Sequence, residues 1–139
     1  MIIANSDEEI LNCFEVLSEL RPNLEKDDFL QTIHLMQSQG YALAFLEKDD
    51  EVLSVAGFRV YYDLSVGGNA LYVYDLVTAE KYRSKGYGEE LLESLDGFAK
   101  SQNCVCIHLD SNTSRHRAHK FYLRNNFSIG AFHFLKIFS

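Results

Sequence analysis

Hydrophobic residues recur along this chain with two different periods, and short polar segments mark where the period changes. Recurrence every three or four residues predicts helices over 7–20, 26–39, 86–99 and 114–125. Alternating or continuous runs of aromatic and β-branched residues predict strands over 41–47, 52–62, 71–78, 104–109 and 132–138. No linker, repeat or low-complexity segment interrupts this order, so residues 1–139 are expected to form one domain.

The order of these elements predicts the topology of an α/β (α+β) fold. Short turns separate the first three long strands, so neighbouring strands should pair antiparallel. A helix joins strand 71–78 to strand 104–109, and such a crossover makes two strands parallel. The sheet should therefore be mixed and mostly antiparallel, with helices on both faces. Ser114 or Thr113 is expected to cap the last helix, and Asn126 to end it in the left-handed conformation.

Residues 71–99 are the part of the chain around which the rest is organised. A buried strand leads through a polar turn into Arg83-Ser84-Lys85-Gly86-Tyr87-Gly88, where a helix begins. The N-terminus of a helix offers unpaired N–H groups to phosphates, and glycine lets a ligand approach the backbone closely. The segment therefore predicts a pyrophosphate-binding loop with two added cations. An ordinary strand-to-helix turn with a basic rim would show the same residue types.

Two common phosphate-binding motifs do not match this loop. The chain contains no G-x-x-x-x-G-K-[ST] string, and Gly88 is followed by Glu89-Glu90-Leu91, so the third glycine of G-x-G-x-x-G is missing. The string R-x-x-G-x-G after a strand ending in Val77-Thr78 instead resembles the acetyl-coenzyme A loop of the GCN5-related N-acetyltransferase (GNAT) family.

A second segment also resembles this family. Ala118, the pair Phe121-Tyr122 and Phe127 match its second signature, which marks a helix beside the thioester. Two positions depart from the pattern: Arg115 stands where asparagine is frequent, and Asn126 stands where glycine is usual. Asparagine tolerates the left-handed conformation well, so that turn can persist. The N-terminal half resembles the family only in the order of its elements.

The resemblance implies a function and a set of site residues. The protein would be an acetyl-coenzyme A-dependent N-acetyltransferase that transfers acetyl to an unassigned primary amine by direct attack in a ternary complex. The parallel strand pair would splay around the cofactor, a backbone N–H near Val77 would stabilise the oxyanion, and Tyr122 would act as the general acid. The implied cofactor-binding residues are Leu76, Val77, Thr78, Arg83, Ser84, Lys85, Gly86, Tyr87, Gly88, Arg115, His119 and Tyr122.

A general base is also needed, and Asp75 is the first candidate. It is the one acid in an otherwise apolar strand and has no paired cation in the sequence pattern, which is unfavourable unless the carboxylate is hydrogen-bonded or faces a cleft. It could instead bond the backbone of a neighbouring loop. Asp110 and His119 are rival bases, whereas His108 and His133 are expected to be structural.

Charge and composition narrow the choice of partners. The net charge of −7 divides into −8 over residues 1–50 (11 acidic, 3 basic) and +1 over residues 51–139 (9 acidic, 10 basic). The acidic half argues against a nucleic-acid partner, and so against an acetyltransferase acting on charged tRNA. No membrane span, signal peptide or metal-ligand spacing is visible. Three cysteines, an odd number, fit reduced thiols and a cytoplasmic location.

Two further expectations concern activity and assembly. A non-catalytic coenzyme A-binding sensor or assembly module would keep the loop at 83–88 but would need no general acid, so the presence of Tyr122 favours an enzyme. The segment 131–138 is very apolar for the edge of a sheet. It would be covered by a second subunit if the protein is a homodimer.

Overall fold

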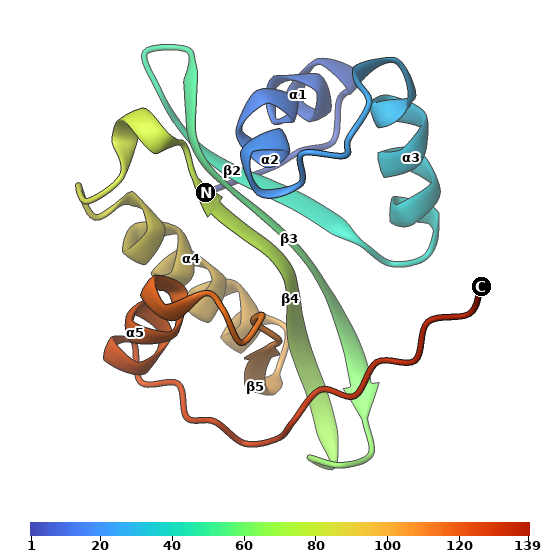
Figure 1. Cartoon of the computed structure of the whole chain (residues 1–139), viewed down its shortest axis with the longest axis vertical. Coiled ribbons are helices and arrows are strands. Elements are labelled where there is room, and N and C mark those ends of the chain that lie inside the picture. The colour runs from blue at the N-terminus through green and yellow to red at the C-terminus, as the bar shows by residue number, and fades with distance from the viewer. The chain divides into compact units, whose positions relative to one another are not determined.

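The computed structural model describes residues 1–139 and divides into two compact units, Met1–His108 and Leu109–Ser139. The first unit contains almost all of the regular structure (Figure 1). Its elements, in chain order, are β1 (Ile2–Ile3), α1 (Asp7–Asn12), α2 (Phe14–Leu20), α3 (Lys26–Ser38), β2 (Ala42–Lys48), β3 (Glu51–Asp63), β4 (Gly68–Thr78), the 3-10 helix η1 (Glu80–Tyr82), α4 (Tyr87–Ser101) and β5 (Cys104–Leu109). No helix is long and apolar enough to cross a membrane.

The sheet has five strands in the order β1-β2-β3-β4-β5. The pairs from β1 to β4 are antiparallel, and β5 lies parallel to β4, which confirms the predicted mixed sheet. Asp49 and Asp50 make the turn between β2 and β3 with φ of 52° and 62°. Short polar side chains tolerate this left-handed conformation, so the predicted acidic hairpin turn is also confirmed.

The N-terminal helices are built from local signals in the sequence. Ser6 and Glu9 form a capping box: the Ser6 hydroxyl accepts from the Glu9 N–H at 3.2 Å, and the Glu9 carboxylate accepts from the Ser6 N–H at 3.0 Å. The single helix expected over 7–20 is wrong, because the chain divides into α1 and α2 at Cys13. The Cys13 N–H bonds to the carbonyl of Ile10, three residues back, which tightens the turn at that point.

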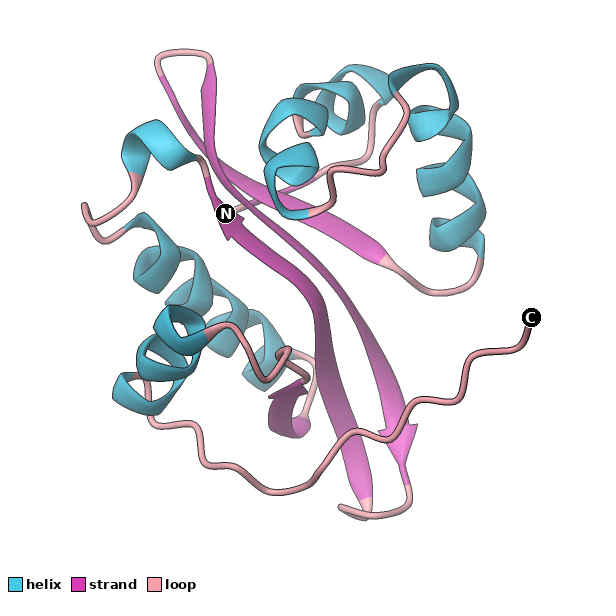
Figure 2. Cartoon of the chain, viewed as in Figure 1, coloured by secondary structure: helices cyan, strands magenta, loops and turns pink.

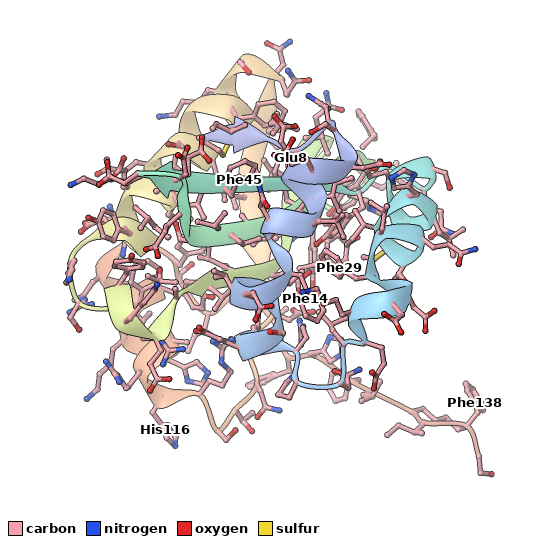
Figure 3. The ribbon with its side chains drawn as sticks, turned by 90° about the horizontal axis from the view of Figure 1, so that it is seen from above. Glu8, Phe14, Phe29, Phe45, His116 and Phe138 are labelled. Carbon is pink, nitrogen blue, oxygen red and sulfur yellow. The ribbon has the colours of Figure 1, made fainter.

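One apolar core joins α1, α2 and α3 to the sheet. Phe14 of α2 and Phe29 of α3 meet edge to face, with ring centroids 5.1 Å apart (Figure 3). Phe45 and Val55 of the sheet belong to the same buried cluster. On the strands beside α4, Phe58 meets Phe98 with ring centroids 5.4 Å apart, and Leu91 and Leu95 of α4 are buried. Figure 2 shows the helices of the first unit against these long strands.

The second unit contains the helix α5 (His116–Arg124) and a segment without regular structure. Asn126 has φ of 66°, which confirms the predicted left-handed residue. The predicted cap is wrong: Arg115 occupies the N-cap position, with no side-chain hydrogen bond there. The strand expected over 132–138 is also wrong. The segment has no regular secondary structure. Its apolar side chains are largely exposed, with Phe134 91% and Phe138 84% exposed.

Candidate active site

Strand β4 changes register against β3 at Tyr74. Val73 pairs with Phe58 and Asp75 pairs with Gly57, so Tyr74 is an extra residue between two successive pairs. A β-bulge of this kind bends the strand and redirects side chains, and bulges are over-represented next to active sites. The residues for which the sequence predicted a base and acetyl-donor contacts, 75–78, follow directly after the bulge.

Asp75 is not the unpaired acid that the sequence suggested. It is buried, at 8% exposure, and its two oxygens accept from Arg21 Nε at 2.8 Å and from the Tyr41 hydroxyl at 3.0 Å. Arg21 also donates to the carbonyl of Tyr74 at 3.1 Å. The partners are thus side chains from the end of α2 and the start of β2, rather than a loop backbone. The sequence suggested a base role because it shows no partner for Asp75, and the structure shows that Asp75 has two. The role itself stays a prediction.

Gly57 makes room for this arrangement. A Cβ at position 57 would overlap the ring of Tyr41, so the ring crosses β3 where a side chain would otherwise stand. The hydroxyl then reaches the carboxylate of Asp75, the residue paired with Gly57. Burial, followed by the Asp75 charge and the hydrogen bond to it, raises the pKa of Tyr41. The phenol therefore stays protonated and donates to Asp75 throughout the neutral range.

The loop before α4 contains two left-handed residues just ahead of the helix. Ser84 and Gly86 are left-handed, with φ of 63° and 87°. The first backbone bond of α4 joins the Glu90 N–H to the Gly86 carbonyl at 2.9 Å, so the N–H groups of residues 87–89 have no partner within the helix. A Cβ on Gly86 would meet nothing within 4 Å. The positive φ, rather than crowding within the protein, therefore calls for glycine there.

The two cations of the loop have different environments. Arg83 Nε donates to the carbonyl of Thr78 at 3.2 Å, and Arg83 Nη2 lies 3.7 Å from the carboxylate of Glu19. Lys85 forms no ion pair, and its Nζ lies 5.5 Å from the centre of the Tyr82 ring. Arg83 thus connects the loop to the end of β4, whereas the ammonium of Lys85 has no protein counter-ion.

The remaining predicted residues of β4 lie after the bulge. Val77 is buried and belongs to the core cluster beneath α1–α3, as expected for a side chain that only packs. Leu76 and Thr78 are half-buried, and Thr78 provides the carbonyl that Arg83 contacts.

In the second unit, α5 carries the other predicted residues. His119 Nε2 lies 2.8 Å from the carbonyl of Asn112, and the N–H of His119 bonds to the carbonyl of Arg115. Tyr122 is half-buried and packs against Phe121 and Phe127 with ring centroids 5.5 Å and 5.7 Å away. Burial raises the pKa of Tyr122 against a smaller opposing effect of Arg115. The phenol is therefore protonated at neutral pH, as a general acid must be.

Asp110, the other rival base, and the two histidines that were expected to be structural also have partners. Asp110 Oδ2 lies 2.9 Å from His133 Nδ1 in the second unit. His108 Nε2 lies 2.8 Å from the Tyr61 hydroxyl and 3.6 Å from Asp63 in the first.

Sequence reasoning missed a group of polar and aromatic side chains on β3, β4 and β5. We call it the aromatic patch, and its members are Arg59, Tyr61, Tyr72, Tyr74 and His108. Tyr72 and Tyr74 have ring centroids 4.6 Å apart, and Tyr72 lies 5.4 Å from His108. A signal was present: β3 reads Arg59-x-Tyr61 and β4 reads Tyr72-x-Tyr74, an alternation of polar and apolar positions inside otherwise apolar strands.

Comparison with known proteins agrees with this fold. The model of the Acetyltransferase (GNAT) family matches residues 7–127. The uncharacterized N-acetyltransferase YhdJ of Bacillus subtilis (strain 168) is 31% identical over 133 residues, covering 94% of this chain and 93% of that protein. A GNAT family acetyltransferase of Staphylococcus aureus superposes with a TM-score of 0.82 at 20% identity, covering 99% of this chain and 96% of the other. A putative acetyltransferase from Agrobacterium tumefaciens gives a TM-score of 0.84 at 18% identity and covers 99% of both chains.

These similarities define the class as an acyl-transferring enzyme with a mixed sheet. The chain belongs to the GNAT family of acetyltransferases, and it is an N-acetyltransferase. The recognition made from the two sequence signatures is therefore confirmed. Members of this family generally use acetyl-coenzyme A as the acetyl donor.

Proposed function

We propose that this protein transfers acetyl from acetyl-coenzyme A to a primary amine, by direct attack of the amine on the thioester in a ternary complex. The observation that carries the proposal is the start of α4. There Gly86 turns the backbone in a left-handed conformation, and the N–H groups of residues 87–89 have no partner in the helix. A pyrophosphate is the kind of group that such an N-terminus binds.

The residues at this loop fit the donor in charge as well as in backbone geometry. Lys85 has no counter-ion in the protein, and Arg83 holds the loop against the end of β4. Glu89 and Glu90 in the first turn of α4 oppose a bound anion, so the backbone amides and Lys85 must outweigh them. The other residues that we propose to bind the donor are Leu76, Val77, Thr78, Arg115 and His119.

Proton transfers set the demands on the remaining residues. An alkylammonium with a pKa near 10.4 requires about 4–5 kcal/mol to lose its proton at pH 7, so a base or a water relay to one is needed. We keep Asp75 in this role, acting through water, because Arg21 and Tyr41 hold its carboxylate in a fixed position beside the bulge. A backbone N–H near Val77 would donate to the developing oxyanion.

The general acid is Tyr122 in this proposal. The departing thiolate needs a proton, because an ordinary thiol has a pKa of about 8.5 and is mostly protonated at pH 7. Burial raises the pKa of Tyr122, so its hydroxyl holds a proton that it can deliver. The amine loses one proton as the C–N bond forms, and the sulfur gains one as the C–S bond breaks.

The experiment that tests this function is a screen of amines with thiol release as the readout, repeated with Tyr122→Phe. We expect the variant to lose about 10²–10⁴ in rate while its affinity for acetyl-coenzyme A stays unchanged. Tyr62→Phe is the matched control, since Tyr62 is 64% exposed on β3 and has no proposed role. Failure to bind acetyl-coenzyme A at millimolar concentration would overturn the proposal. Binding without turnover of any amine would favour a non-catalytic module.

We also propose that the protein is a cytoplasmic homodimer. The cysteines Cys13, Cys104 and Cys106 are all free thiols, as in a reducing compartment. Exposed apolar side chains near the end of the chain support assembly; they are Phe132, Phe134, Leu135, Ile137 and Phe138. Light scattering should give twice the 15.9 kDa mass of one chain, and Phe134→Asp should return the monomer. A monomeric wild-type protein would contradict the dimer.

A further inference from the structure

Arg59 lies at the centre of the aromatic patch on the first unit. It is half-buried on β3, and its guanidinium lies 5.0 Å from the centre of the Tyr61 ring and 6.0 Å from that of Tyr74. Its Nε atom is buried and donates to no acceptor. A buried N–H without a partner is unfavourable by about 1–3 kcal/mol. Stacking on the rings offsets part of this and holds the planar fork of the guanidinium in place.

No carboxylate of the protein neutralises Arg59, although Asp63 and Asp75 lie on the same strands. Asp75 is paired with Arg21 and accepts from Tyr41. Asp63 accepts from the N–H and the hydroxyl of Ser65 at 2.8 Å and 2.7 Å, and from the Tyr61 hydroxyl at 3.2 Å. His108 lies 3.6 Å from Asp63. Both acids are thus occupied, whereas the guanidinium forms no ion pair.

The patch lies close to the residues proposed for acetyl transfer. Tyr74 contacts the guanidinium and is the bulged residue of β4. Val77, whose N–H is proposed to bind the oxyanion, is three residues further along the strand. At about 3.3 Å per residue, this spacing corresponds to roughly 10 Å. A small molecule can span that distance with an amine at one end and a second polar group at the other.

We propose that Arg59 binds an anionic group of the acceptor, a carboxylate or a phosphate, while Tyr61 and Tyr74 pack against the body of the molecule. The acceptor is then an amine that also carries an oxyacid, such as an amino acid or an amino-sugar phosphate. A guanidinium matches both groups through two parallel N–H···O bonds. Asp63 argues for a cationic acceptor instead, but its oxygens already have donors from Ser65 and Tyr61. This inference deepens the proposed function and rests on it.

The test uses pairs of amines that differ only in the anionic group. Suitable pairs are phenylalanine with phenethylamine, lysine with cadaverine, and glucosamine 6-phosphate with glucosamine. We expect the wild-type protein to acetylate at least one anionic member at least tenfold more efficiently than its partner. The first two pairs report a carboxylate, and the third reports a phosphate.

Variants of Arg59 assign the preference to this residue. Arg59→Met keeps the apolar stem and removes the hydrogen-bond donors. It should raise the KM for the anionic acceptor by about 10–100-fold and change kcat less. For the neutral amine of the same pair, KM and kcat should stay unchanged. Arg59→Lys keeps the charge but not the fork, and should lie between Met and wild type. Arg124→Met on α5 removes an exposed arginine as the matched control. Equal losses for both members of a pair would overturn the proposal.

A binding measurement separates this inference from the proposed enzyme activity. Phenylalanine, lysine and glucosamine 6-phosphate are each titrated into wild type and Arg59→Met in the presence of coenzyme A, by calorimetry and without turnover. Binding that depends on Arg59 in a protein that acetylates nothing would support the anion site and contradict the acetyl-transfer proposal. Turnover that ignores both Arg59 and the anionic group would support the enzyme and contradict the site.

Discussion

Strands β3 and β4 carry two different surfaces along their length. In the first, Val55 and Val77 pack beneath α1, α2 and α3 in the apolar core. In the second, the same strands carry the aromatic patch, where Arg59 lies between Tyr61 and Tyr74. Along β4 the patch ends at the bulged residue Tyr74, and the buried Asp75 separates it from the core residue Val77. One pair of strands therefore supplies both a stabilising core and a surface suited to recognition.

Truncation in the core should have the largest effect on stability. Phe45 is 2% exposed, and Phe45→Ala should lower the free energy of unfolding by about 3–5 kcal/mol, because it leaves a cavity that the helices cannot fill. Urea denaturation measures this change. Leu35→Ala on α3, where Leu35 is 60% exposed, should change the same quantity by less than about 0.5 kcal/mol. A small loss at Phe45 would mean that the core is less tightly packed than the burial indicates.

A second substitution tests the boundary between the two surfaces. Gly57→Ala should lower the free energy of unfolding by about 1–3 kcal/mol, since the new methyl group overlaps the Tyr41 ring. Tyr41→Leu destabilises in a different way, by removing the hydrogen bond to Asp75. The double variant has no such overlap. Its loss of unfolding free energy should therefore be smaller than the sum of the losses in the two single variants. Simple additivity would contradict the contact between Tyr41 and Gly57.

The smallest effect concerns pH and Asp63, whose carboxylate accepts a hydrogen bond from Tyr61 of the aromatic patch. Hydrogen bonds from the side chain and backbone of Ser65 lower the pKa of Asp63 in the folded protein from its ordinary value of 3.8. The stabilisation is therefore present above that value and is lost as pH falls through the lowered pKa. We expect Asp63→Asn to show a shallower fall in unfolding free energy between pH 5 and about pH 2.5 than wild type. Asp96→Asn, at an exposed position of α4, is the control, and identical slopes for Asp63→Asn and wild type would refute the assignment.

Local patterns predicted the elements of the first unit well because their causes are local. The capping pattern at Ser6, the polar turn at Asp49-Asp50 and the glycine before α4 each act within a few residues. The strand expected over 132–138 failed for the opposite reason, since a strand needs a partner and hydrophobicity alone does not supply one.

The surroundings of the site depended on contacts between distant residues. Arg21, Tyr41 and Gly57 meet Asp75 from three separate elements, so the sequence of β4 alone gives no sign that its acid is paired. The same applies to Arg59, whose unused hydrogen-bonding capacity appears only when its neighbours are known. The two family signatures are short motifs, so the sequence alone was enough to name the loop at 83–88 and Tyr122 as candidate site residues.

The left-handed turn at Gly86 has a consequence for chirality. With φ at 87° and free space where a Cβ would stand, this position resists an L-amino acid because of its handedness and not because of its size. A mirror-image alanine, introduced by chemical synthesis, would adopt the same torsion without strain. The start of α4 should therefore be about 1–2 kcal/mol less stable with an L-residue at position 86 than with its mirror image.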